Sequence, residues 1–298
     1  MTIIHKIIKQ LASSKKQWVI VTVFLGGLSL PTAMAQSPWH GSIGVQSSLT
    51  ELRSDDALIE NDQSASGALN LGVGYALNDS WSIHSGVGIG YLNNNASLLN
   101  YSGIQNAVDL EGEAFEFRYT LSRYSEDQRY TVVSIPLAVQ YETAGATRFY
   151  ARAGASYNIF VTSEAEARAN SLTTTGYFEQ LNAELEGPRF AGFGTFEDIA
   201  FAKQDVDIKN AVNATLELGI KQRVAAKHWL YLGFFVETGL NNLLNSNGES
   251  LLQYNRESPT DFRVNPSLNA TDQGSGNALL KDAKFRSFGL KFWYSFNF

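Results

Sequence analysis

The sequence predicts an all-β fold, an antiparallel transmembrane β-barrel of eight strands, with ten strands as the alternative. Three observations predict it: an N-terminal export signal, apolar residues that alternate with small or polar ones at period two, and connections that are short and long by turns. Beyond residue 36 no apolar run approaches the ~18 residues of a membrane-spanning helix. Strands with one apolar face suit a barrel wall between lipid and a polar interior.

The first 35 residues have the layout of a secretory signal. Four lysines without any acid precede an apolar run from Trp18 to Leu30, and an Ala-x-Ala site ends at Ala35. The run is shorter than the ~20 residues of a membrane span, so an anchoring helix is the less favoured alternative. We expect removal of 1–35 in a bacterial cell and a mature barrel domain, 36–298, in the outer membrane.

The composition excludes several classes of function. The absence of cysteine excludes disulfides, thiolate metal sites, a cysteine nucleophile and a lipid-modified cysteine. Removing the four signal lysines leaves 19 basic against 29 acidic residues, so the formal net charge falls from -6 to -10 and argues against nucleic acid as a partner. His40, His84 and His228 lie far apart without ligand spacing, so we expect no metal and no cofactor.

Eight segments alternate between an apolar and a small or polar face, which meets the even count of a closed single-chain barrel. They are 39–50, 67–77, 81–92, 129–142, 147–161, 209–223, 228–241 and 284–298. Aromatic residues near the segment ends, such as Trp81, Tyr91 and Tyr141, predict interfacial girdles.

The connections alternate in length, which predicts the orientation of the barrel. The short ones are 78–80, 143–146 and 224–227, and the long ones are 51–66, 93–128, 162–208 and 242–283. Short turns belong to the periplasmic side, so we expect four long extracellular loops and periplasmic ends of the mature chain.

One further segment, Glu113–Leu121, also alternates. A ninth membrane strand would break the even count, so we interpret it as a hairpin above the membrane beside the fourth strand. The ten-stranded alternative needs one more strand within 162–208.

Glycines alternate with Val and Ile in Gly72–Gly74 and Gly86–Gly90. A phosphate-binding loop instead needs a glycine-rich turn that opens a helix. We therefore expect these glycines to line the interior and to make room for larger side chains opposite.

The last strand looks like the C-terminal assembly signal of outer-membrane barrels, which implies the barrel-assembly machinery as a partner. The residues at that spacing are Ser287, Gly289, Phe292, Tyr294 and Phe298. Two further stretches, Val133–Leu137 and Thr238–Leu244, resemble the small-barrel family that includes PorT-like proteins of Bacteroidetes. This resemblance spans nearly all of 36–298 and implies an eight-stranded barrel, with little about activity.

Charged residues on the inward faces of the last four strands predict a network. Arg152, Glu217, Glu237 and Lys291 fall near mid-height, with Arg148, Lys221 and Arg223 below them. An eight-stranded barrel is only wide enough for side chains, so a salt-bridged plug is favoured over a gated path for ions or small solutes.

A lipid-acting enzyme fails a geometric test. His84 and Ser134 face inward on neighbouring strands, but Ser134 lies roughly two residue pairs too high to form a nucleophile and base pair. We therefore expect a protein that is not an enzyme.

The long loops are polar, but they contain six aromatic residues. These residues either anchor contacts with a partner or pack the loops against one another, and the second interpretation is favoured. These are Phe178, Phe190, Phe193, Phe196, Tyr254 and Phe262. We expect a monomeric barrel that contacts lipid and lipopolysaccharide and uses its loops for interaction or envelope integrity. The alternative is a narrow channel or conduit for ions, small solutes or apolar molecules.

Overall fold

The computed structural model describes residues 38–54 and 59–298. The predicted signal peptide and its cleavage site lie outside the described residues. The chain divides into two compact units, of which Pro38–Asn297 contains the strands described below. Within the described part, no helix is long and apolar enough to cross a membrane.

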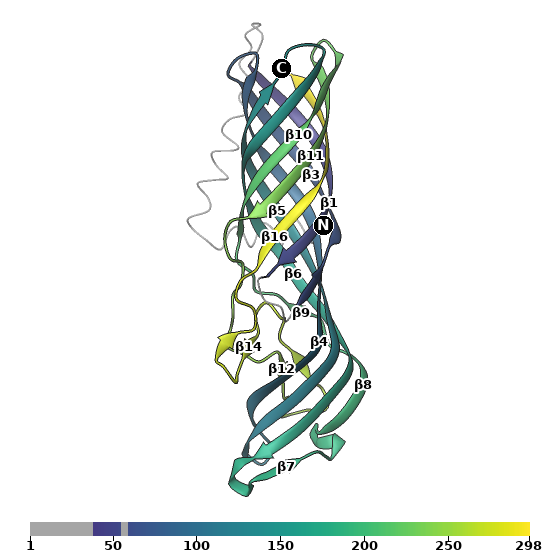
Figure 1. The fold of residues 1–298 in the computed structure, drawn as a ribbon, viewed down its shortest axis with the longest axis vertical. Helices are drawn as coiled ribbons and strands as arrows, with labels where there is room; N and C mark the ends of the chain where they lie inside the picture. Colours follow the sequence, from purple (N-terminus) through teal and green to yellow (C-terminus); the bar gives the residue numbers. More distant parts are fainter. Residues whose placement is uncertain (1–37, 55–58) are drawn as a thin grey trace. The chain divides into compact units, whose positions relative to one another are not determined.

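Eight antiparallel strands form a closed ring, which confirms the predicted fold and excludes the ten-stranded alternative (Figure 1). In ring order they are β1 (Trp39–Arg53), β3 (Ser64–Ala76), β4 (Trp81–Val108), β5 (Ala114–Glu142), β6 (Thr147–Phe178), β10 (Ala211–Ala225), β11 (His228–Gly239) and β16 (Lys284–Asn297). Each strand pairs with the next in this order, and β16 pairs with β1 from Asn297 opposite His40 to Lys284 opposite Arg53. The wall therefore has no open edge at its seam.

The remaining elements are short and lie in the long connections. They are β2 (Glu60–Asp62), η1 (Glu179–Leu181), β7 (Ala183–Leu185), η2 (Arg189–Ala191), β8 (Gly194–Ala200), β9 (Gln204–Asp205), β12 (Leu252–Gln253), β13 (Arg263–Val264), β14 (Thr271–Asp272) and β15 (Asn277–Ala278). Strand β2 pairs with β4, whereas β7, β8 and β9 pair with β6.

The wall exposes its apolar face, as the alternation predicts. Large apolar side chains that point outward remain exposed on all eight strands, among them Leu69, Leu137 and Leu232. Near the short turns the predicted girdle forms, with the Trp39 and Tyr75 rings 4.9 Å apart and the Trp81 and Tyr141 rings 5.1 Å apart. An apolar belt edged by aromatic rings is the surface that a bilayer covers.

Inward-facing glycines make room for bulky interior side chains, as predicted. A Cβ atom on Gly44 would lie 2.3 Å from the Trp293 ring, and one on Gly74 would lie 2.1 Å from His40 Nε2. Gly219 and Gly233 likewise lie directly against Tyr150. The large rings fit inside the barrel because the neighbouring strand has a glycine, and therefore no side chain, at that level.

Three wall strands continue far beyond the membrane segments, where long loops were expected. Strands β4 and β5 stay paired as far as Val108 opposite Ala114, and β5 and β6 as far as Glu116 opposite Tyr177. Most of 93–128 and the start of 162–208 are therefore strand. The following segments are together called the extension: residues 93–108 of β4, 114–130 of β5 and 162–178 of β6, with β7, β8 and β9.

The segment Glu113–Leu121 forms a hairpin with β4 above the membrane segments, as interpreted from the sequence. Its expected place beside the fourth strand is wrong, because it is the continuation of the fourth strand itself. At Arg123 the backbone has φ 48°, and the pairs Leu98–Tyr124 and Asn100–Ser122 keep one register on either side of it. Leu121 and Tyr124 are nevertheless both buried, so the inward face passes from odd to even positions here, and one long strand reads as two alternating segments.

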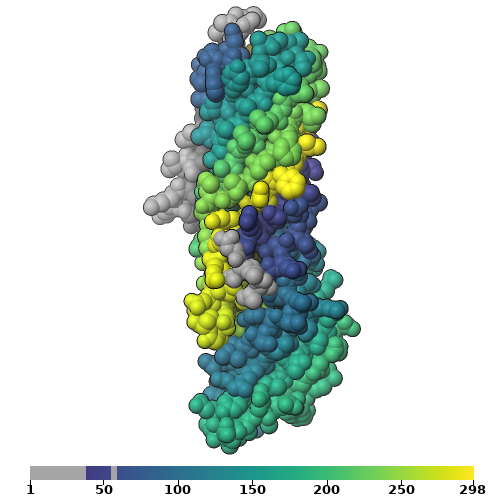
Figure 2. Space-filling model, in the orientation of Figure 1, coloured from purple at the N-terminus to yellow at the C-terminus, as the bar shows by residue number. Residues whose placement is uncertain are grey.

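The extension has a hydrophobic core of its own. The inner faces of its strands bury Phe117, Leu121 and Leu172 against Leu251 and Leu252 from the connection between β11 and β16. In Figure 2 this yellow segment lies against the teal strands of the extension. The extension is therefore a packed structure.

The six loop aromatics mostly serve this packing, which is the interpretation favoured from sequence. Phe178, Phe193 and Phe262 are buried, and Phe196 and Tyr254 pack against the same core. Phe190 is the exception, because 79% of it is exposed.

The seam between β1 and β16 yields a prediction. A Cβ atom on Gly289 would lie 2.1 Å from the Ser47 carbonyl oxygen, so Gly289→Leu should lower the amount of assembled barrel without affecting export. The matched control is Gly67→Ala on β3, whose Cβ would lie 3.4 Å from the Gln46 oxygen. The measurement is the fraction of the protein in the outer membrane whose gel mobility changes after boiling. Normal yield of Gly289→Leu would contradict this account of the seam.

Candidate functional site

Three charged residues from three strands of the ring meet inside the barrel, and we call them the inner triad: Arg152 on β6, Glu217 on β10 and Lys291 on β16. Arg152 and Glu217 are direct partners across the two strands. Glu217 Oε2 lies 3.5 Å from Arg152 Nη1 and 3.7 Å from Lys291 Nζ. The other oxygen, Oε1, accepts a hydrogen bond of 2.6 Å from the Tyr150 hydroxyl. One carboxylate is thus shared by two cations.

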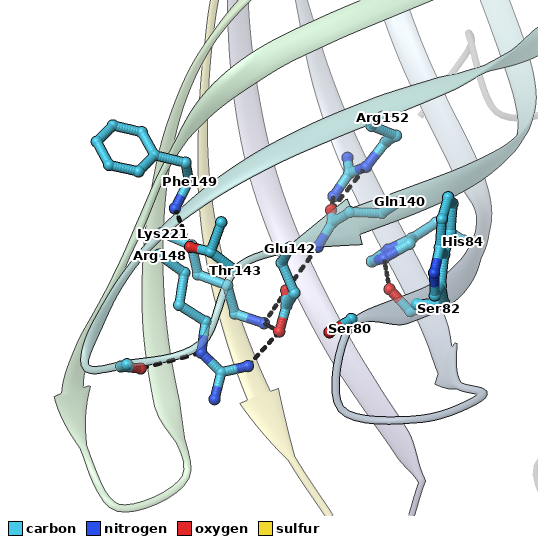
Figure 3. Close-up of polar contacts among 12 residues, drawn as sticks. Ser80, Ser82, His84, Gln140, Glu142, Thr143, Arg148, Phe149, Arg152 and Lys221 are labelled. Carbon is cyan, nitrogen blue, oxygen red and sulfur yellow. Dashed lines mark hydrogen bonds and ion pairs between the residues drawn. The ribbon is translucent and has the colours of Figure 1, made fainter.

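A second group lies nearer the short turns, and we call it the outer triad: Glu142, Arg148 and Lys221 (Figure 3). Arg148 pairs with Glu142 Oε1, and Lys221 Nζ lies 2.8 and 3.1 Å from the two oxygens of the same carboxylate. Again two cations share one carboxylate.

Gln140 connects the two triads. Its side-chain oxygen accepts hydrogen bonds of 3.1 and 2.6 Å from Arg152, and its amide nitrogen donates one of 2.9 Å to Glu142. Gln140 is fully buried. The network therefore runs without a break from Lys291 to Arg148.

The structure brings together most of the predicted network and leaves out two of its members, Glu237 and Arg223. Glu237 accepts hydrogen bonds from Ser156 Oγ at 2.8 Å and from Asn213 Nδ2 at 2.6 Å, with no cation within ion-pair distance among the described residues. Arg223 lies exposed at the rim, 5.9 Å from the Trp229 ring centroid, and forms no described ion pair.

The sequence prediction missed Glu142 and Gln140, because it considered charges on the last four strands alone. Both residues lie on the inward face of β5 directly before the turn at 143–146. That position was a usable signal, since Arg148 follows the same turn and Gln140 lies opposite Arg152.

A second level of the interior is closed by aromatic side chains. The Tyr130 ring lies 5.6 Å from Phe160 and 5.4 Å from Phe285. Leu52 and Val132 are buried in the same cluster. These residues fill the barrel where the extension begins.

Above this level a buried carboxylate holds the connection between β11 and β16 in place. Glu126, with no exposed surface, accepts hydrogen bonds from Ser267 N at 2.9 Å and Ser267 Oγ at 3.1 Å. Tyr124 and Gln128 donate to the same carboxylate at 2.7 and 2.6 Å. Burial raises the pKa of Tyr124 well above its ordinary value, so its hydroxyl stays a donor.

The histidines are placed differently from the sequence expectation. His40 and His84 lie on adjacent parts of the ring with centroids 5.0 Å apart, so the view that the histidines are far apart is wrong for this pair. His84 Nε2 bonds to Ser82 Oγ at 2.9 Å. The described residues contain no group of three or more His, Asp or Glu that could hold a metal ion.

The geometric argument against a hydrolytic pair is confirmed. His84 lies opposite Ala138, whereas Ser134 lies opposite Gly88, four residues further along β4. Ser134 instead donates to Asn158 Oδ1 at 2.5 Å. These two residues cannot act as nucleophile and base.

The residues of the proposed assembly signal occupy both faces of β16. Ser287 and Gly289 point inward, and Ser287 Oγ lies 2.8 Å from Thr50 Oγ1 across the seam. Phe292, Tyr294 and Phe298 are exposed. Their role in assembly stays a prediction.

A family model described as the outer membrane protein beta-barrel domain matches residues 20–234, well over half of the chain. The chain belongs to this family. Membership agrees with the closed ring and its apolar belt, and it places the chain among bacterial outer-membrane barrels.

Several solved structures of outer-membrane proteins are similar. Neisserial surface protein A is 10% identical, with 87% of this chain and 97% of that one covered and a TM-score of 0.33. Ail of Yersinia pestis is 10% identical, with 86% and 98% covered and a TM-score of 0.32. OprG of Pseudomonas aeruginosa is 11% identical, with 88% and 97% covered and a TM-score of 0.36. No curated protein matches the chain.

The sharing of Glu217 leads to a prediction about stability. Glu217→Gln leaves two buried cations without a carboxylate, so it should lower the free energy of unfolding by about 3–5 kcal/mol. Lys291→Met leaves the Arg152–Glu217 pair intact and should cost less. The double variant Glu217→Gln/Lys291→Met also removes one of the two unpaired cations, so it should recover part of the lost free energy of unfolding.

The measurement is the urea midpoint of the refolded barrel in lipid for each single variant and the double variant. Glu237→Gln is the matched control, because Glu237 bonds only to neutral donors, and its effect should add to that of Lys291→Met. If the changes in urea midpoint of Glu217→Gln and Lys291→Met simply add in the double variant, the two residues do not interact.

Proposed function

We propose that the protein is a closed, non-enzymatic outer-membrane barrel whose function resides in its extracellular extension. The extension presents a surface for interaction with other molecules or supports the integrity of the envelope. The observation that carries this proposal is that side chains fill the interior at two separate levels while three wall strands continue outward as a packed sheet.

The lower closure is the salt-bridged plug. Its two triads and Gln140 join strands β5, β6, β10 and β16, which span half of the ring. Tyr150, Tyr231, Trp229 and Trp293 form a buried cluster beside them. Eight strands leave an interior that such side chains fill.

The upper closure has a different chemistry. The aromatic cluster around Tyr130 contains no charge, and the connection between β11 and β16 covers it through Ser267 and Glu126. A solute would have to displace both levels to pass, which favours a structural role of the interior.

The outer face of the extension is polar and ordered. Ser102, Thr120, Thr173 and Thr195 lie in one row across four paired strands. The Ser102 and Thr120 hydroxyls are 2.9 Å apart, and those of Thr173 and Thr195 are 3.2 Å apart. A fixed surface of hydrogen-bonding groups outside the membrane supports a binding role.

The remaining parts of the proposal follow from the sequence. An export signal ending at Ala35 supports export, and the assembly signal in β16 supports contact with the barrel-assembly machinery. The stretches Val133–Leu137 and Thr238–Leu244 support a place near PorT-like barrels. The exposed apolar belt supports contact with lipid and lipopolysaccharide as a monomer.

A narrow channel is the second candidate, and one observation favours it. His40 Nε2, Asn70 Nδ2 and Trp293 Nε1 are buried polar atoms without a hydrogen-bond partner among the described residues. Such atoms call for water or solute in the interior. A path for small solutes would use this side of the barrel.

Recordings in planar bilayers separate the two candidates. The native barrel should show near-zero conductance, because both levels are closed. Tyr130→Ala combined with Lys291→Ala shortens a side chain in each level and should produce stepwise conductance, whereas each single change should leave one closure intact. Thr120→Ala on the outer face is the control, and stable native channels would contradict the proposal.

A further inference from the structure

The inner triad carries one positive charge more than its carboxylate neutralises. Only 12% of the Arg152 side chain, 3% of that of Glu217 and 14% of that of Lys291 are exposed. A buried charge without a partner is strongly unfavourable, so the interior requires a further negative charge near these residues.

The other charged residues that face the interior do not supply it. The outer triad also has two cations on one carboxylate, so it adds positive charge. Glu237 lies opposite Thr215, two residues beyond Glu217 along β10, and spends its hydrogen bonds on Ser156 and Asn213. Glu126 is held by Ser267 beyond the aromatic level.

The same place has unused hydrogen-bond donors. A guanidinium has five N–H bonds, and Arg152 directs three toward Gln140 and Glu217, which leaves two. Trp293, 9% exposed, has no hydrogen-bond partner for Nε1 among the described residues, and its ring centroid lies 5.6 Å from Arg152 Cζ.

We propose that the barrel interior binds a small inorganic anion between the inner triad and Trp293. Arg152 and Lys291 supply the charge, and the indole N–H supplies a further donor. Water molecules would satisfy these donors, but they would not neutralise the excess positive charge of the inner triad.

The surroundings restrict the ligand to a small anion. Tyr150 and Phe235 are buried beside the triad, and Lys291 Nζ lies 4.3 Å from the Phe235 ring centroid. The outer triad and Arg223 line the approach from the short turns with positive charge, which attracts anions toward the interior. The inference stands apart from the proposed function, since a conducting barrel would hold the same anion.

Thermal unfolding of the refolded barrel in zwitterionic nanodiscs tests the proposal. At constant ionic strength, chloride or phosphate replaces gluconate, a larger organic anion. A bound anion stabilises only the folded state, so the unfolding midpoint should rise by about 2–4 °C and saturate with concentration. Equal midpoints in all three anions would overturn the proposal.

Matched variants locate the site. Lys291→Met neutralises the inner triad and should abolish the anion dependence, whereas Arg129→Met removes an exposed cation of the extension and should leave it unchanged. Trp293→Phe keeps an aromatic ring but removes the indole N–H donor, so this variant should need a higher anion concentration to reach the same rise in unfolding midpoint. An unchanged dependence in Lys291→Met would overturn the assignment.

A direct measurement covers the case in which Lys291→Met does not fold. Crystals of the native barrel soaked in bromide should give an anomalous peak within hydrogen-bond distance of Trp293 Nε1 and the Arg152 guanidinium. The absence of a peak there, in crystals with ordered bromide elsewhere, would overturn the proposal.

Discussion

The constraint on which this structure depends is that every backbone N–H and C=O group within the bilayer must find a partner in the wall. The chain meets it by pairing β16 with both β11 and β1, so that no strand edge faces lipid. Closing the ring at eight strands then fixes the width of the interior, which is just wide enough for side chains to fill. Charges, rings and glycines inside the barrel are consequences of this limit.

Buried charges are stable in so narrow a space only when they are connected. Glu217 and Glu142 each serve two cations, and Gln140 joins the two groups by accepting from Arg152 and donating to Glu142. The network ties the hairpin of β5 and β6, in the middle of the chain, to the last strand, β16. It therefore holds together strands that come from distant parts of the sequence, and it leaves an excess of positive charge inside.

The eight wall segments and their inward faces could be predicted because alternation and turn length are local properties of the chain. The pairing of Arg152 with Glu217 followed from equal distances to the short turns. The extension could not be predicted, because the alternation reverses at Arg123 and its inner face is as apolar as a lipid face. His40 and His84 come close because both lie opposite Gly74 of β3, which has no side chain between them, and Glu237 was misplaced because its partners are neutral.

The central claim is that three wall strands leave the membrane as a folded sheet on the cell surface. The protein contains no cysteine, so single cysteines can be labelled in intact cells with a membrane-impermeant maleimide. Thr120→Cys on the exposed face should react at once, Phe117→Cys on the buried face only after denaturation, and Asp79→Cys in a short turn only after permeabilisation. Equal labelling at positions 120 and 117 would contradict the folded sheet, and labelling at position 79 in intact cells would contradict the orientation.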